Sequence, residues 1–337
     1  MGNAHFDSLS AEQREAAFAA LRNVLGSAPI DAVTPLKGGA TAAAILRIDA
    51  GKHRYLLRIE GAPSPLRNSH QYVSLRIATD AGIAPRLYYY DDVARIAVMD
   101  FVVQRPLSAY PGGPFALAQA IGELVRRLQS TELFPYFVDY PDIVARLWAH
   151  VCRTGLFAPG VLDPANERFA AFRDAYVWDR TGSVSSHNDL IPANILFDGQ
   201  RLWLVDWESA YRNDPLVDVA IALDNLARTP ELEAALLRAW LGRPPGDELD
   251  ARLKLTRALT RLYYAGVFFS ASATFPRTAP NTDVTAPSLA DFQRALSDGR
   301  LKPGTGQTKH VLGKMFLAAF MTDVLTPGFN AAVAEHL

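Results

Sequence analysis

Cysteine is almost absent from this chain of 337 residues, and its scarcity excludes two kinds of site. The single cysteine, Cys152, cannot form a disulfide within the chain, and no C-x-x-C pair is present to hold zinc. We expect Cys152 to be a small buried apolar residue.

Neither sign of charge is in excess, since 34 Lys and Arg residues oppose 35 Asp and Glu residues and give a net charge of −1. A broad basic surface for nucleic acid needs a positive excess, so that class of protein is disfavoured. The longest apolar stretches, near residues 262–273 and 315–325, are too short or too interrupted to span a bilayer. Residues 7–15 carry too many charges for a signal peptide. These absences predict a soluble cytoplasmic protein with no nucleic-acid or membrane partner.

Hydrophobic residues make up 49% of the chain, which is enough for a sizeable core in one large domain or in two lobes sharing a cleft. Alternation and turn residues predict strands at 32–37, 42–48, 53–60, 86–90 and 94–101. A helix is expected at 69–81, and from residue 115 onward the apolar spacing is mostly helical.

One loop and the strand after it carry the strongest chemical signal. Asp189 precedes Asn194 by five residues, and an apolar strand at 202–205 ends in Asp206. Phosphoryl transfer requires a carboxylate that faces the acceptor hydroxyl and oxygen ligands for Mg²⁺ on separate elements. Asp189 suits the first role, and Asn194 and Asp206 suit the second. The alternative is that these are ordinary turn residues.

The motif beginning at His187 has the H-x-D-x-x-x-x-N spacing of the kinase catalytic loop. The pattern D-W-E-x-A-x-x-N-D-P-x-x-D-x-A follows from Asp206. Together they resemble the aminoglycoside phosphotransferase and choline kinase family, above all its bacterial choline kinase-like branch. The resemblance implies a bilobal α+β protein-kinase-like fold. Its first lobe (1–103) would hold an antiparallel sheet and helix αC, and its second, larger lobe (104–337) would be mostly helical. The implied cofactors are ATP and Mg²⁺, and the implied partner is a small-molecule hydroxyl acceptor.

The resemblance also places the nucleotide phosphates. Gly38 and Gly39, in the first turn, would approach them through backbone N–H groups, although Gly-Gly is also an ordinary hairpin turn. Arg58 stands where protein kinases have a lysine that binds phosphate, and its alternative is an exposed strand arginine. The expected helix at 69–81 lacks the glutamate that normally pairs with this cation. Arg58 therefore needs another partner, or binds phosphate directly.

By its position, the end of the strand at 94–101 corresponds to the kinase hinge. Backbone groups of Asp100 and Val102 would bind adenine, with Leu56 above the base and Leu196 below it. The alternative is an ordinary buried strand end.

The acceptor is predicted from the residues that follow Asp206. Glu208 supplies a carboxylate, and Trp207 and Tyr211 supply aromatic faces, which suit a cationic amine. This favours a choline-like amino alcohol, with an aminoglycoside or another small metabolite as the alternative. A nucleotide-binding pseudokinase is a further alternative because the helix glutamate is missing. A protein kinase is disfavoured because no Ala-Pro-Glu segment follows Asp206. The number of Mg²⁺ ions and the oligomeric state are left open.

Overall fold

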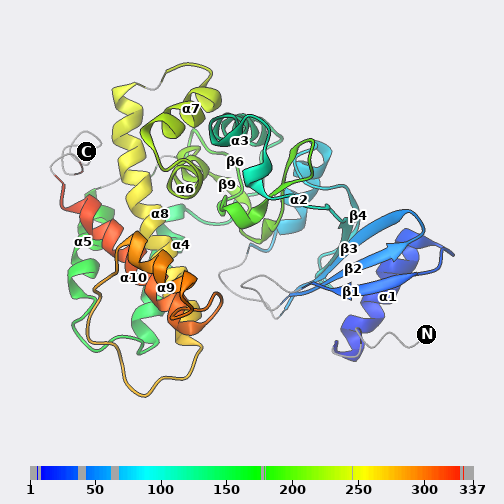
Figure 1. Cartoon of the computed structure of the whole chain (residues 1–337), viewed down its shortest axis with the longest axis horizontal. Coiled ribbons are helices and arrows are strands. Elements are labelled where there is room, and N and C mark those ends of the chain that lie inside the picture. The colour runs from blue at the N-terminus through cyan, green and yellow to red at the C-terminus, as the bar shows by residue number, and fades with distance from the viewer. Residues whose placement is uncertain are drawn as a thin grey trace. The chain divides into compact units, whose positions relative to one another are not determined.

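The computed structural model describes residue 6 and residues 9–36, 43–61, 68–175, 178, 180–244, 246–326 and 329. The chain forms two compact units (Figure 1). The first comprises Met1–Phe137, Val184–Arg212 and Asn225–Gly242, and the second comprises Val138–Ser183, Asn213–Asp224 and Arg243–Leu337. The lobe boundary expected between residues 103 and 104 stays a prediction.

The first unit contains a five-stranded sheet of order β1-β2-β3-β5-β4, in which every pair of neighbours is antiparallel. The strands agree with the five predicted ones to within a few residues: β1 (Ala32–Pro35), β2 (Ala44–Ala50), β3 (His53–Ile59), β4 (Leu87–Asp91) and β5 (Ile96–Asp100).

Helix α1 (Ala11–Leu25) covers one face of this sheet. It begins with a capping box, in which the Ser10 side chain accepts from the Gln13 N–H and the Gln13 side chain accepts from the Ser10 N–H. Its apolar side packs on alternate strand residues such as Leu57, which is fully buried. Because successive strand residues face opposite ways, Leu56 and Arg58 lie on the other face, which remains available for a ligand.

Among the remaining elements of the first unit, α2 contacts β4 of the sheet, and the others pack chiefly on one another. Helix α3 lies against α7, and a Cβ at Gly122 would lie 2.3 Å from the Leu236 carbonyl oxygen, so only glycine permits this approach. The elements are α2 (Gln71–Asp80), the 3₁₀ turn η1 (Leu107–Ala109), α3 (Gly113–Gln129), β6 (Val184–Ser186), η2 (Pro192–Asn194), β7 (Ile195–Phe197), β8 (Leu202–Leu204), η3 (Trp207–Ser209), β9 (Tyr211–Asn213) and α7 (Pro230–Leu241). Strand β6 pairs with β9, and β7 pairs with β8.

The second unit is helical, as the periodicity predicts. Its long helix α8 packs on α4 and α10, and ion pairs join Asp224 of α6 to Arg257 and Arg261 of α8. Arg261 also pairs with Asp323 of α10, so three helices share one charge network. The helices are α4 (Tyr140–Arg153), α5 (Asp163–Ala175), α6 (Leu216–Leu226), α8 (Asp247–Ala273), α9 (Leu289–Ser297) and α10 (Gly306–Val324).

The expectation of a buried cysteine is wrong, because Cys152 is exposed on α4. Its Sγ lies 3.7 Å from the Asn166 Oδ1. The buried side of α4 runs through Leu147, Trp148 and Val151. A residue directly after Val151 is rotated by about 100° away from that side, which carries it toward solvent.

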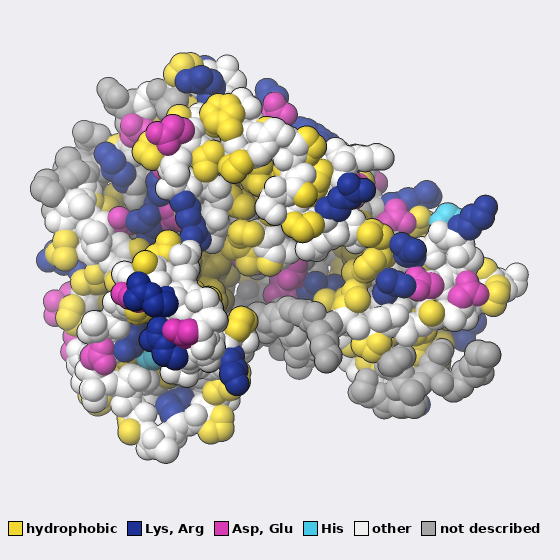
Figure 2. All heavy atoms as spheres, viewed as in Figure 1, with side chains coloured by type: hydrophobic (Ala, Val, Ile, Leu, Met, Phe, Trp, Pro, Cys, Tyr) yellow, Lys and Arg dark blue, Asp and Glu magenta, His cyan; other side chains and the backbone are white. Residues whose placement is uncertain are grey.

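Among the described residues, no helix is both long enough and apolar enough to cross a bilayer. Figure 2 shows basic and acidic side chains interspersed over the viewed face, as the balanced charge leads one to expect.

His310 of α10 gives the second unit a stability that depends on pH. Its ring lies 5.4 Å from that of Phe157 and 5.6 Å from that of Phe269, and neither ring nitrogen has a hydrogen-bond partner among the described residues. Burial, helped by the charge of Lys314 and opposed by Asp283, lowers the pKa of His310 from 6.5 to about 4.

The unfolded chain therefore binds an extra proton between these two pKa values. We expect the free energy of unfolding to fall as the pH drops from 6.5 toward 4 and to lose this part of its pH dependence in His310→Phe. Denaturant unfolding of the parent and the variant at several pH values measures this free energy. An identical pH profile for the variant and the parent would contradict the assignment.

Candidate active site

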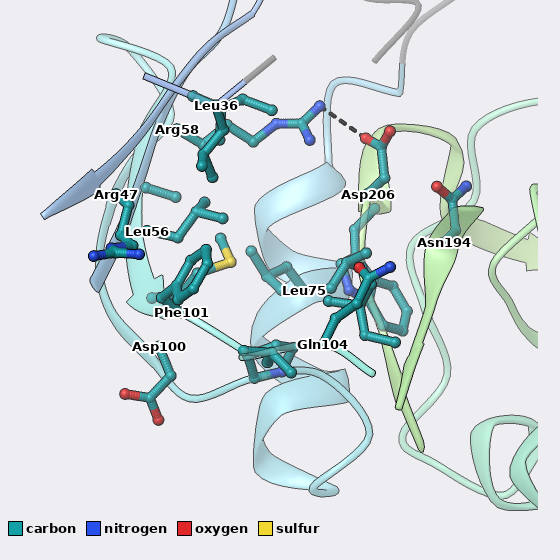
Figure 3. A pocket seen from close by; sticks show the side chains of 18 of the residues that line it. Leu36, Arg47, Leu56, Arg58, Leu75, Asp100, Phe101, Gln104, Asn194 and Asp206 are labelled. Atoms are coloured by element: carbon teal, nitrogen blue, oxygen red, sulfur yellow. Dashed lines mark ion pairs between the residues drawn. The ribbon is translucent and has the colours of Figure 1, made fainter. Parts of the chain in front are cut away.

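A cavity of about 760 Å³ lies in the first unit, on the face of the sheet opposite α1 (Figure 3). Strands β2, β3 and β5 form one wall, α2 forms another, and residues 193–208 close the opposite side. Apolar side chains such as Leu56 and Phe101, beside the charged Arg47 and Asp100, line the cavity toward the end of β5, and charged side chains line it around Arg58 and Asp206. Such a division suits a ligand with a flat apolar part and an anionic part.

The apolar part brings together the residues expected to hold adenine. Leu56 lies on the strand side with Leu36. Leu196, on β7, lines the same cavity. Asp100 and Val102 border the same space at the end of β5. The structure thus places all four predicted adenine contacts around one cavity.

Two backbone N–H groups at the expected hinge already donate hydrogen bonds within the protein. The Asp100 N–H donates to the Arg86 carbonyl oxygen and the Phe101 N–H donates to the Arg54 carbonyl oxygen, each at 2.9 Å. A backbone contact between Asp100 and adenine must therefore use its carbonyl oxygen as the acceptor. The Asp100 carboxylate points away from the cavity and accepts from the Tyr88 hydroxyl at 2.9 Å.

The loop that carries the H-x-D-x-x-x-x-N motif is organised by Asn194, which is 5% exposed at the end of η2. Its Nδ2 donates to the backbone oxygen of Asp189 at 2.9 Å and to its Oδ2 at 2.8 Å. These two bonds fix the Asp189 carboxylate relative to Asn194 and commit the amide nitrogen. The structure therefore joins two of the three residues that the motif singles out.

Asp206, the third residue that the motif singles out, lies between β8 and η3 and has a left-handed backbone conformation (φ 67°). This conformation is uncommon outside glycine, and Asp and Asn tolerate it best. Figure 3 shows the Asp206 and Asn194 side chains next to each other, with the amide oxygen of Asn194 on the Asp206 side. Both line the cavity, so their oxygens face the same space.

This donor set fits Mg²⁺, which prefers oxygen ligands and takes only one or two carboxylates from the protein. No group of three or more His, Cys, Asp or Glu residues that could hold a metal occurs in the described part of the chain. A metal at Asn194 and Asp206 would therefore complete its shell with phosphate oxygens and water.

Arg58 lies at the charged end of the cavity among three carboxylates. Its guanidinium lies 2.5 Å from Glu60, 2.8 Å from Asp206 and 3.2 Å from Glu208. Oδ1 of Asp206 is buried and is not aligned for a hydrogen bond, so its contact with Arg58 is an ion pair only. Burial would lower the pKa of Arg58, but the charges of Asp206, Glu60 and Glu208 outweigh it and raise that pKa. Arg58 is thus a fixed cation and not an exposed strand arginine.

Two further residues brace the loop, namely His187, the first residue of the motif, and its neighbour Asn188. Asn188 has a left-handed backbone (φ 61°), and its Nδ2 donates to the carbonyl oxygens of Ser209 and Tyr211 at 2.9 and 3.1 Å. His187 is fully buried, with Nε2 2.9 Å from the Val205 oxygen. They tie the loop to both sides of Asp206. The role of Asn188 cannot be seen in the sequence, because its hydrogen-bond partners lie 21 and 23 residues further along the chain.

The residues expected to bind the acceptor have different environments. Trp207 is 5% exposed and Tyr211 is 4% exposed; the Trp207 indole N–H donates to the Leu204 oxygen. Trp207 and Glu208 line the cavity, and Glu208 faces Arg58. Their contact with an acceptor stays a prediction. Gly38 and Gly39, expected to approach the phosphates, lie outside the described residues.

Comparison with known proteins identifies relatives of this chain. Residues 32–253 match the model of the phosphotransferase enzyme family. Protein LicA of Haemophilus influenzae is 39% identical over 54 residues, which are 16% of this chain and 20% of that protein. The chain thus spans only a fifth of the length of this curated relative.

Solved structures extend the similarity to nearly the whole chain. A choline/ethanolamine kinase family protein from Mesorhizobium loti superposes with a TM-score of 0.64 at 20% identity, over 96% of this chain and 98% of that one. Spectinomycin phosphotransferase in complex with ADP and spectinomycin gives 0.52 at 13% identity, over 91% and 98% of the two chains. These similarities confirm the α+β kinase-like fold expected from the sequence.

Proposed function

The chain belongs to the phosphotransferase enzyme family, and on this premise we propose that it transfers the γ-phosphoryl group of ATP to a hydroxyl group of a small molecule. The observation that carries the proposal is the pair of hydrogen bonds from Asn194 to Asp189, made beside Asp206 at the charged end of a cavity. It unites a candidate base with two candidate metal ligands. The alternative of a pseudokinase predicts that one of these groups is missing.

Each residue has a role in this reaction. Asp189, held by Asn194, would orient the acceptor hydroxyl and take its proton late in the transfer, because the transition state is loose. Arg58 would bind phosphate oxygens, for which its planar group of N–H donors is well suited. Leu56, Leu196 and the hinge would hold the base. Asn194 and Asp206 would hold Mg²⁺, which when bound would neutralise charge on the phosphates.

The acceptor that we favour is an amino alcohol of the choline or ethanolamine type. One structural relative is described as a choline/ethanolamine kinase family protein. Of the acidic residues between 206 and 224, Asp206 and Glu208 line the cavity, where their carboxylates would attract a cationic amine. An aminoglycoside is the second candidate, because spectinomycin phosphotransferase has the same fold.

A panel of acceptors tests this order. With choline, ethanolamine, an aminoglycoside and a neutral sugar assayed side by side, we expect the amino alcohols to exceed the sugar by about fivefold in kcat/KM, since a cation near carboxylates and rings gains on the order of 1 kcal/mol. Equal or better use of the sugar would exclude the cationic acceptor and leave the kinase proposal intact. ATP binding without transfer to any acceptor would favour the pseudokinase.

A further inference from the structure

At the charged end of the cavity, a single arginine contacts more than one carboxylate. Arg58 has a side chain that is 13% exposed and contacts the carboxylates of Glu60, Asp206 and Glu208. Glu60 is 2% exposed, whereas Asp206 and Glu208 are 24% and 19% exposed. One buried positive charge therefore faces three negative charges that differ in their access to solvent.

Helix α2 supplies none of these carboxylates. Its residues at the cavity are Gln71, Tyr72 and Leu75, all of them uncharged. The Tyr72 hydroxyl is buried and has no hydrogen-bond partner among the described residues, and burial together with the charge of Glu60 raises its pKa. As the sequence predicts, the helix offers Arg58 no carboxylate, and it presents a neutral phenol to the cavity instead.

The helix is instead fixed to the segment after Asp206 by hydrogen bonds. Both Asn68 Nδ2 and Ser74 Oγ donate to the Ala210 carbonyl oxygen, at 2.5 and 2.8 Å. The Asn68 N–H donates to the backbone oxygen of Glu208 at 3.3 Å. Glu208 is therefore held at a defined place beside the helix and the cation.

The three carboxylates do not have the same task. Asp206 is the one proposed to bind Mg²⁺, and an arginine that neutralises it competes with the metal for the same oxygens. Glu60 directly follows the last residue of β3, two residues after Arg58, and its carboxylate lies 2.5 Å from the guanidinium. Glu208 reaches Arg58 from the other side, through η3.

We propose that Glu60 and Glu208 are positioning residues that hold Arg58 by themselves, in place of a helix carboxylate, so that Asp206 is released for Mg²⁺ when nucleotide binds. This inference rests on the proposed function. With two other partners, Arg58 remains paired after it leaves Asp206, which avoids an uncompensated buried charge. Without Glu60 and Glu208, Arg58 stays paired with Asp206 and weakens the binding of Mg²⁺ there.

The test measures how much Mg²⁺ is needed to tighten ATP binding, by calorimetry over a series of Mg²⁺ concentrations. In Glu208→Gln we expect the half-effective Mg²⁺ concentration to rise about fivefold to tenfold, as for a charge pair close to the metal. Glu208→Asp keeps a carboxylate, so its half-effective Mg²⁺ concentration should lie between those of the parent and Glu208→Gln. Adding Arg58→Met to Glu208→Gln removes the competing cation and should return the Mg²⁺ requirement to the parent value or below.

Glu60→Gln tests the second partner, with a matched control on β2. Asp49 stands two residues after Arg47 and pairs with it at 2.6 Å, the same arrangement as Arg58 and Glu60. Asp49→Asn should leave the Mg²⁺ requirement within about twofold, whereas Glu60→Gln should raise it about as much as Glu208→Gln. Because Glu60 is buried, its variant can unfold; Glu208→Gln then carries the test alone.

Two outcomes would overturn the inference. One is an unchanged Mg²⁺ requirement in a folded Glu208→Gln protein. The other is a rise in acceptor KM with no change in Mg²⁺ or ATP binding, which would assign Glu208 to the acceptor, as the sequence suggested. Failure of the proposed function is distinct, because the parent protein would then bind ATP without transferring its phosphoryl group to any acceptor, whatever the Mg²⁺ requirement of the variants.

Discussion

The Asp189→Asn variant is expected to lose roughly two to four orders of magnitude in kcat, the range seen when a general base is removed. Asparagine has nearly the same shape and keeps an oxygen that can accept the bond from Asn194 Nδ2. It cannot take a proton from the acceptor hydroxyl. The Kd for ATP should change little, because Asp189 does not line the cavity that would hold the nucleotide.

Asp198→Asn provides a matched control in the nearby β7–β8 turn. Asp198 accepts hydrogen bonds from the Gln200 and Arg201 N–H groups and from the Trp203 indole, and it lies outside the proposed machinery. Its variant should keep kcat within about twofold, as is usual away from a site. Steady-state phosphorylation and calorimetry give both values. Near-normal turnover in Asp189→Asn would remove Asp189 from the mechanism.

The second large effect is expected in Asp206→Ala, which removes a proposed metal ligand. Calorimetry with ATP should show that Mg²⁺ no longer tightens binding, and turnover should fall below detection. In the absence of Mg²⁺ the affinity for ATP should be kept or increased, because Arg58 loses one of its three competing carboxylates. These opposite responses separate a metal ligand from a residue that merely supports the fold.

Asp206→Asn controls for the backbone at this position. The left-handed conformation of Asp206 (φ 67°) strains alanine, whereas asparagine tolerates it. If both variants lose the Mg²⁺ effect while Asp206→Asn keeps the parent Tm, the carboxylate itself is required. A Mg²⁺ effect that persists in both variants would place the metal elsewhere.

The sequence by itself determined the order and the type of the elements, because these depend on local patterns. The alternation in 53–60 and the helical pattern in 69–81 act within a few residues, and the structure confirms the strand and the helix that they predict. The motif at 187–206 identified the family for the same reason. Its residues are close along the chain, and their chemistry depends on spacing.

Only the tertiary structure decided what surrounds Arg58. Glu60 was within reach of sequence reasoning, since it lies only two residues further along the chain. Glu208 was not, because it lies 150 residues further along the chain, and packing alone brings it to 3.2 Å. The same reason applies to Asn68 and Ala210, which are 142 residues apart and joined by a hydrogen bond. Periodicity records which face of an element is buried, but it does not record which distant side chain that face meets.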